Sequence, residues 1–238
     1  MKNRIEVARS VSLVPVVEVR PYSFSKRPMP DLPGGSEGSP AVWSAYFQEC
    51  MRDAGFAGVD PVAPSSSFVP LAALVGNPAF ERIVLRSLGD KRVVAGGGAA
   101  EPASIAIDDV PALYGGLALI GDGVRLFEPQ CCGDLENLGD WRAALADAPA
   151  AGSIWAGHPP LAVSFAGDLV TLAVEWEVPP PGPLTEVALP VAWLAAAFEE
   201  ATAVVEQCRR RALPMIGRLC GEGIIAEDLS KALFGVPG

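Results

Sequence analysis

The sequence has little positive charge, a single histidine and no long apolar run. It carries 18 lysines and arginines against 28 aspartates and glutamates, which gives a net charge of −10 over 238 residues. Such a surface repels the phosphates of nucleic acids, so the charge argues against a nucleic-acid partner. Charge or proline interrupts every apolar run well before the roughly 20 residues that a membrane-spanning helix needs. We therefore expect a soluble protein with no membrane partner.

The amino-terminal stretch lacks the features of a secretory signal. MKNRIEVARS mixes both signs of charge, and Glu18 interrupts the apolar run that follows. A signal would show a longer apolar segment and a small-residue cleavage site. The five cysteines are an odd number, which without a secretion signal favours reduced thiols. The sequence therefore predicts an intracellular, cytoplasmic protein.

Signatures of the common cofactor and metal sites are also missing. There is no GxSxG, no Gly-Lys-Ser/Thr of a phosphate-binding loop and no CxxC pair. The run Gly96-Gly97-Gly98 lacks the third glycine of a dinucleotide fingerprint, because Glu101 stands in its place. We therefore expect neither a metal ion nor a cofactor.

Apolar spacing predicts an α+β fold in a single domain over residues 1–238. Adjacent strands joined by tight turns, with helices before and after them, favour a mixed or mainly antiparallel sheet packed by helices. Strand patterns occupy residues 11–19, 117–120, 124–127, 153–157, 161–165 and 168–177. Helical spacing occupies residues 40–54, 77–89 and 135–145, a long C-terminal helix from Pro190, and a short one at 226–235.

Proline and arginine positions add detail to this outline. Pro15 predicts that strand 11–19 lies at a sheet edge or at a bulge, because proline cannot donate to a ladder. The prolines and glycines of residues 21–40 predict a long loop without regular structure, ended by Ser39-Pro40 as the cap and first residue of a helix. In the long helix, Trp193 joins the apolar stripe and Arg209–Arg211 stand near the carboxyl end.

One pair of adjacent thiols is the candidate for chemistry. Cys131 and Cys132 follow the second hairpin strand, and a thiolate nucleophile would need the only histidine, His158, as its base. Asp134 and Glu136 would raise the pKa of a nearby thiol, which argues against catalysis. The alternative is structural, with one cysteine packed inward and the other at a turn.

Two surfaces are candidates for binding. The loop 21–40 carries Tyr22, Phe24, Lys26 and Arg27, which have no evident role in a core, so we expect either a binding loop or a disordered one. Asp134 and Glu136 lie on the solvated side of the predicted helix 135–145, where they would meet a basic partner.

Residues 109–130, DVPALYGGLALIGDGVRLFEPQ, resemble the central strands of the SUKH superfamily, in which a Gly-Gly turn opens a hairpin after a helix. The resemblance implies a small intracellular α+β domain. Many bacterial members are regarded as immunity proteins that bind and neutralise toxins.

These observations favour a non-enzymatic protein that binds another protein of basic charge. Its function would be that of an immunity-like protein. A thiol-dependent enzyme using Cys131 or Cys132 with His158 is the first alternative. A structural subunit of a larger assembly is the second, and the oligomeric state stays open.

Overall fold

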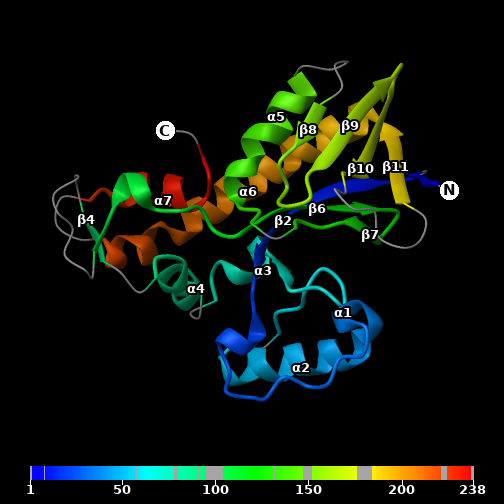
Figure 1. Ribbon diagram of the computed structural model, residues 1–238. Coiled ribbons are helices and arrows are strands. Elements are labelled where there is room, and N and C mark those ends of the chain that lie inside the picture. The colour runs from blue at the N-terminus through cyan, green and yellow to red at the C-terminus, as the bar shows by residue number, and fades with distance from the viewer. Residues whose placement is uncertain are drawn as a thin grey trace. The chain divides into compact units, whose positions relative to one another are not determined.

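The computed structural model describes residues 2–7, 9–56, 58–77, 80–89, 92–94, 104–130, 132–146, 152–175, 184–220 and 224–236 (Figure 1). Helices and mainly antiparallel strands make up an α+β protein, which confirms the predicted fold class. The chain forms two compact units. The first comprises Met1–Pro15 and Tyr114–Glu206, and the second comprises Val16–Leu113 and Gln207–Gly238.

The first unit contains a five-stranded sheet in the order β1-β11-β10-β9-β8. Its strands are β1 (Lys2–Glu6), β8 (Gly152–Ile154), β9 (Leu161–Ala166), β10 (Leu169–Val174) and β11 (Leu184–Pro190). β1 pairs parallel with β11 and the other pairs are antiparallel, so the sheet is mixed as predicted. β1 and β11 were not predicted from the sequence. β11 pairs with a strand on each side, and this pairing stabilises it although its own sequence has no strand pattern.

Two hairpins confirm the turns predicted from glycine and aspartate. β9 and β10 meet at Gly167-Asp168, where Gly167 has φ +64°. β6 (Gly115–Gly121) and β7 (Val124–Phe127) join through Asp122 and Gly123, which have φ +52° and +81°. Positive φ at both central residues is the geometry that matches the twist of hairpin strands.

β2 (Val11–Glu18) confirms the predicted strand, but of the two positions expected from Pro15, a sheet edge or a bulge, the edge is wrong. The four-stranded sheet has the order β3-β2-β6-β7, so β2 is an interior strand. β3 (Phe68–Pro70) pairs only with Val16–Glu18. Pro15 precedes that register, so its missing N–H removes no bond to β3.

The first unit also contains a short 3₁₀ turn, η3 (Leu135–Asn137), that leads into α5 (Leu138–Ala146). Asp134 caps this turn, because its Oδ1 accepts the N–H of Glu136 at 2.9 Å. α5 contacts β8, as Figure 1 shows. The buried apolar side chains of η3 and α5 are Leu135, Leu138 and Trp141.

The first part of α6 (Val191–Leu219) belongs to the same unit and corrects one expectation. Trp193 is exposed rather than part of the buried stripe, and Leu194 is buried in its place. The remaining buried side chains up to Glu206 are Ala197, Phe198, Ala201 and Val205. The Arg142 guanidinium lies 5.9 Å from the Phe198 ring centre and links α5 to α6.

In the second unit, α2 (Pro40–Asp53) confirms the predicted helix with a buried aromatic face. The Ser39 Oγ donates to the carbonyl of Pro33 at 3.0 Å and makes no hydrogen bond to the helix end. The expectation that residues 21–40 lack regular structure is wrong in part. They contain η1 (Pro21–Ser23) and the single turn α1 (Gly35–Gly38), while Ser25–Leu32 is irregular.

The other elements of the second unit are short. They are α3 (Leu71–Leu74), α4 (Phe80–Ser87), β4 (Arg92–Val94), β5 (Ser104–Ala106), η2 (Ile107–Asp109) and α7 (Ala226–Leu233). α4 buries Phe80, Ile83 and Val84 as predicted. The glycine run 96–98, Glu101 and Trp176 lie outside the described residues.

Arg209–Arg211 are not near the end of α6, because the helix continues to Leu219 with Pro214 inside it. Arg209 is 6% exposed and lies 2.6 Å from Glu227 Oε1 and 2.8 Å from Ser230 Oγ, both on α7. Arg209 therefore has a packing role that the helix dipole argument does not capture.

Candidate functional site

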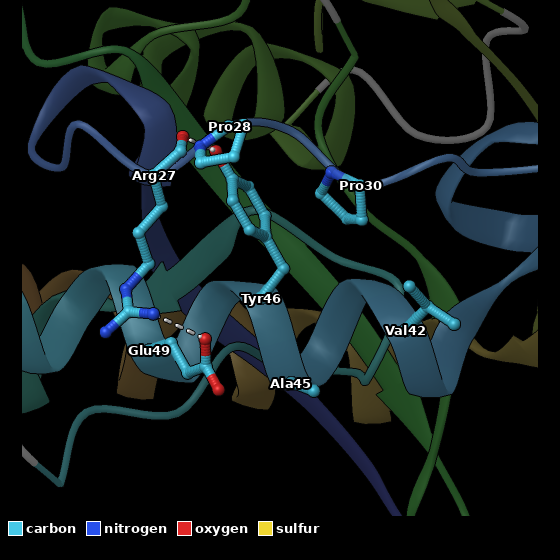
Figure 2. Close-up of a pocket in the computed structure, with 7 residues that line it drawn as sticks. All are labelled: Arg27, Pro28, Pro30, Val42, Ala45, Tyr46 and Glu49. Carbon is cyan, nitrogen blue, oxygen red and sulfur yellow. Dashed lines mark hydrogen bonds and ion pairs between the residues drawn. The ribbon is translucent and has the colours of Figure 1, made fainter.

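The second unit has an open groove between the irregular segment Ser25–Leu32 and α2. We call it the α2 groove. It has a volume of 330 Å³ and is lined by Arg27, Pro28, Pro30, Val42, Ala45, Tyr46 and Glu49. Figure 2 shows Tyr46 rising from the helix toward Arg27 and Pro28, with Val42 at the opposite end. Its lining is mainly apolar, and an ion pair between Arg27 and Glu49 closes one end.

Arg27 fixes the segment above the helix. Its Nε lies 2.6 Å and its NH2 3.2 Å from the two carboxylate oxygens of Asp53, and its NH1 lies 2.9 Å from Glu49. The Tyr46 hydroxyl donates to the Arg27 carbonyl at 3.3 Å. The side chains of Arg27, Asp53 and Glu49 are each about two-fifths to one-half exposed, so the ion pairs add little stability. They position the backbone that carries Pro28 and Pro30.

The other loop residues predicted to bind have different surroundings. Phe24 packs edge-on against Phe56 with ring centres 5.8 Å apart, and Arg82 lies 5.7 Å from the Phe24 ring centre. Phe24 is therefore mainly a packing residue. Tyr22 and Lys26 are exposed but do not line the α2 groove.

Sequence reasoning missed the helix side of the α2 groove. Val42, Ala45 and Glu49 recur at spacings of three and four on the exposed side of α2. Val42 is 45% exposed although valine on a helix normally faces a core, but only the structure shows this exposure.

In the first unit, three chain segments meet at Gly133. We call this the three-loop junction: Tyr114–Gly116, Cys132–Asp134 and Trp155–His158. A Cβ at Gly133 would lie 3.0 Å from the Gly115 carbonyl oxygen and 3.1 Å from that of Ala156. The Gly115 N–H donates to the Gly133 carbonyl at 2.9 Å, and the Gln130 N–H donates to that of Ala156 at 2.7 Å. A side chain at Gly133 would need these backbones to move by a few tenths of an ångström, so glycine favours their close approach.

The three-loop junction brings together several residues singled out from the sequence. Cys132 is exposed at φ +66°, and His158 is exposed with its ring centre 6.2 Å from that of Trp155. Cys131 lies outside the described residues, so its proposed chemistry stays a prediction.

Acidic and amide side chains lie at the base of the same junction. Burial raises the pKa of Asp134 and the like charge of Asp140 adds to the rise, while N–H groups of Glu136 and Asn137 oppose it. Asn137 is 3% exposed. In the described part of the chain, neither Asn137 Oδ1 nor Nδ2 has a hydrogen-bond partner, and the same holds for Trp141 Nε1. Buried polar groups without a hydrogen-bond partner are rare in native proteins, so the side chains of Asn137 and Trp141 are unusual.

The described residues form neither a metal site nor a membrane-spanning helix. The described residues contain no group of three or more histidine, cysteine and acidic side chains that could hold a metal ion. Among the described helices, none combines the length and the apolar run that a membrane crossing requires. No protein-family model, curated protein or solved structure matches this chain.

Proposed function

We propose that this chain is a non-enzymatic binding protein that recognises a basic partner protein through the α2 groove. The observation that carries the proposal is the open, mainly apolar groove between Ser25–Leu32 and α2, with Val42 45% exposed at its end. A volume of 330 Å³ is at the low end of the range for ligand pockets. It suits one or two apolar side chains of a partner better than an enclosed small molecule.

The segment Ser25–Leu32, which forms one wall of the α2 groove, is held in place without a partner. Pro28 and Pro30 have fixed φ angles, and Arg27 ties the segment to Asp53 and Glu49. A wall that is ordered in advance loses less conformational entropy on association. This favours recognition of a partner surface without large rearrangement.

The net charge of −10 supports a partner of opposite sign. Complementary charge accelerates encounter and disfavours wrong partners. The SUKH resemblance of residues 109–130 adds a partner class, the toxins that immunity proteins neutralise. We include this immunity-like role in the proposal.

The test begins with a photo-cross-linking amino acid at position 42 in the native cell extract. We expect it to capture a basic protein, and the capture to weaken as salt increases. The captured partner is then purified and its affinity measured for two variants of α2. Ala45→Arg places a long side chain in the α2 groove, whereas Ala41→Arg places it on an exposed site of the same helix outside the groove.

Ala45→Arg should weaken binding by at least about 30-fold, the effect of losing a central contact, and Ala41→Arg by no more than about threefold. Equal effects of the two variants, or capture of acidic proteins only, would contradict the proposal.

A further inference from the structure

The three-loop junction carries two exposed aromatic residues, and the backbone of each lies next to an acidic residue. Tyr114 is 51% and Trp155 is 45% exposed. Tyr114 and Asp134 are opposite residues of an isolated antiparallel bridge, so their side chains leave the backbone on the same face with Cβ atoms about 5 Å apart. Asp140 Oδ2 accepts the backbone N–H of Trp155 at 3.3 Å. The junction therefore offers two aromatic–acid pairs.

Both pairs belong to one locality. Gly133 lies next to Asp134 in the chain and packs against the carbonyls of Gly115 and Ala156, the neighbours of Tyr114 and Trp155. The two carboxylates also repel each other, since the charge of Asp140 helps to raise the pKa of Asp134. A bound cation would relieve this repulsion, whereas an anion would increase it.

The chemistry of the pairs favours a guanidinium over other cations. A guanidinium is planar, stacks on aromatic faces and presents five donors in a fork that matches carboxylates. An ammonium group is a compact charge that holds its water more strongly.

We propose that the three-loop junction is a binding site for an arginine side chain, held by the rings of Tyr114 and Trp155 and by the carboxylates of Asp134 and Asp140. The inference rests on the proposed function in that the basic partner protein supplies the arginine. The site is separate from the α2 groove, so the two can be tested apart.

The experiment uses the full chain labelled with ¹⁵N and the capped peptide acetyl-Gly-Arg-Gly-amide. Two matched peptides replace arginine with lysine or with uncharged citrulline. We expect saturable shifts of the Trp155 indole and the Gly133 amide with the arginine peptide, weaker ones with lysine, and none with citrulline.

Variants assign the binding to the named groups. Asp140→Asn keeps an acceptor for the Trp155 N–H but removes the charge, and should weaken peptide binding about tenfold. Trp155→Ala removes an exposed ring and should weaken it about threefold. The controls are Asp168→Asn at an exposed turn and Trp193→Ala at an exposed helix site, which should change nothing.

Three results would overturn the arginine site: equal binding of the citrulline peptide, equal binding of the lysine peptide, or equal effects of the variants and their controls. Each outcome is independent of the α2 groove. Ala45→Arg should bind the arginine peptide as the unmodified chain does. Loss of peptide binding with intact cross-linking at position 42 would overturn only the junction, and the converse only the α2 groove.

Discussion

The guanidinium of Arg27 donates hydrogen bonds to both oxygens of the Asp53 carboxylate, with Nε 2.6 Å from Oδ2 and NH2 3.2 Å from Oδ1. Together with a hydrogen bond from the Ser25 hydroxyl at 3.1 Å, it holds the pKa of Asp53 below its ordinary value. This pair links the wall of the α2 groove to the last turn of α2.

The lowered pKa makes a prediction about pH. A carboxyl whose pKa is lower in the folded state stabilises the fold above its unfolded pKa of about 3.9 and loses that contribution as pH falls through the folded pKa. Arg27→Gln should raise the pKa of Asp53 toward its ordinary value and reduce the pH dependence of stability below about pH 4. A carboxyl ¹³C titration measures both proteins. Arg52→Gln removes the same charge one residue from Asp53 and should move the pKa less, because Arg52 contributes least among the causes of the shift. Equal shifts would contradict the assignment to Arg27.

The pair Arg209–Glu227 predicts a loss of stability. Arg209 is almost fully buried, whereas the Glu227 side chain is partly exposed. Glu227→Gln keeps the shape but removes the charge opposite a buried guanidinium, so we expect the free energy of unfolding to fall by about 1–3 kcal/mol. Urea unfolding followed by circular dichroism measures it. Asp228→Asn is the control, since Asp228 is exposed on the same helix, and its effect should stay within about 0.5 kcal/mol. A similar loss in both variants would show that the buried pair is not the cause.

The sequence predicted the elements whose signals are local. The helix of residues 40–54 and the two glycine–aspartate hairpins depend on spacing and turn chemistry within a few residues, and the structure has all of them. β1 and β11 were missed because a charged strand and a strand after a proline run are stabilised by pairing with distant segments.

The same limit applies to the sites. The sequence indicated Arg27 because it lies in a loop where it has no role in a core. It did not indicate the side of α2 that faces Arg27, because Val42 and Ala45 are ordinary residues in a helix. The three-loop junction depends on Gly133, whose neighbours Gly115 and Ala156 are far away in sequence. No spacing rule connects such positions, so their meeting could not be predicted.

Gly133 allows a direct test of this meeting of backbones. Gly133→Ala would place a Cβ 3.0–3.2 Å from three carbonyl oxygens, so we expect a loss of about 1–3 kcal/mol in the free energy of unfolding. Gly139→Ala is the matched control, because a Cβ there has nothing within 4 Å and the residue lies in α5. That change should stabilise the protein by up to about 1 kcal/mol. A neutral Gly133→Ala in thermal and urea unfolding would contradict the packing of the junction.

Asn137 predicts a substitution that increases stability. A buried polar group without a partner costs about 1–3 kcal/mol, so the apolar side chain of similar size in Asn137→Leu should raise the free energy of unfolding by about 1 kcal/mol. Asn137→Asp should lower it, because a charge would be buried at the same place. A destabilising Asn137→Leu would mean that the amide is satisfied in solution.

The non-enzymatic proposal predicts that the adjacent thiols are not activated by the histidine. A thiolate activated by an imidazole reacts much faster than an ordinary thiol near neutral pH, because the thiolate is the nucleophile. We therefore expect iodoacetamide to label Cys131 and Cys132 at the same rate in the unmodified chain and in His158→Gln, as measured by mass spectrometry of the modified peptides. Cys50, which is buried in α2, is the internal reference for overall unfolding. A large fall in the labelling rate of either thiol in His158→Gln, with Cys50 unchanged, would favour the thiol-dependent enzyme over the binding protein.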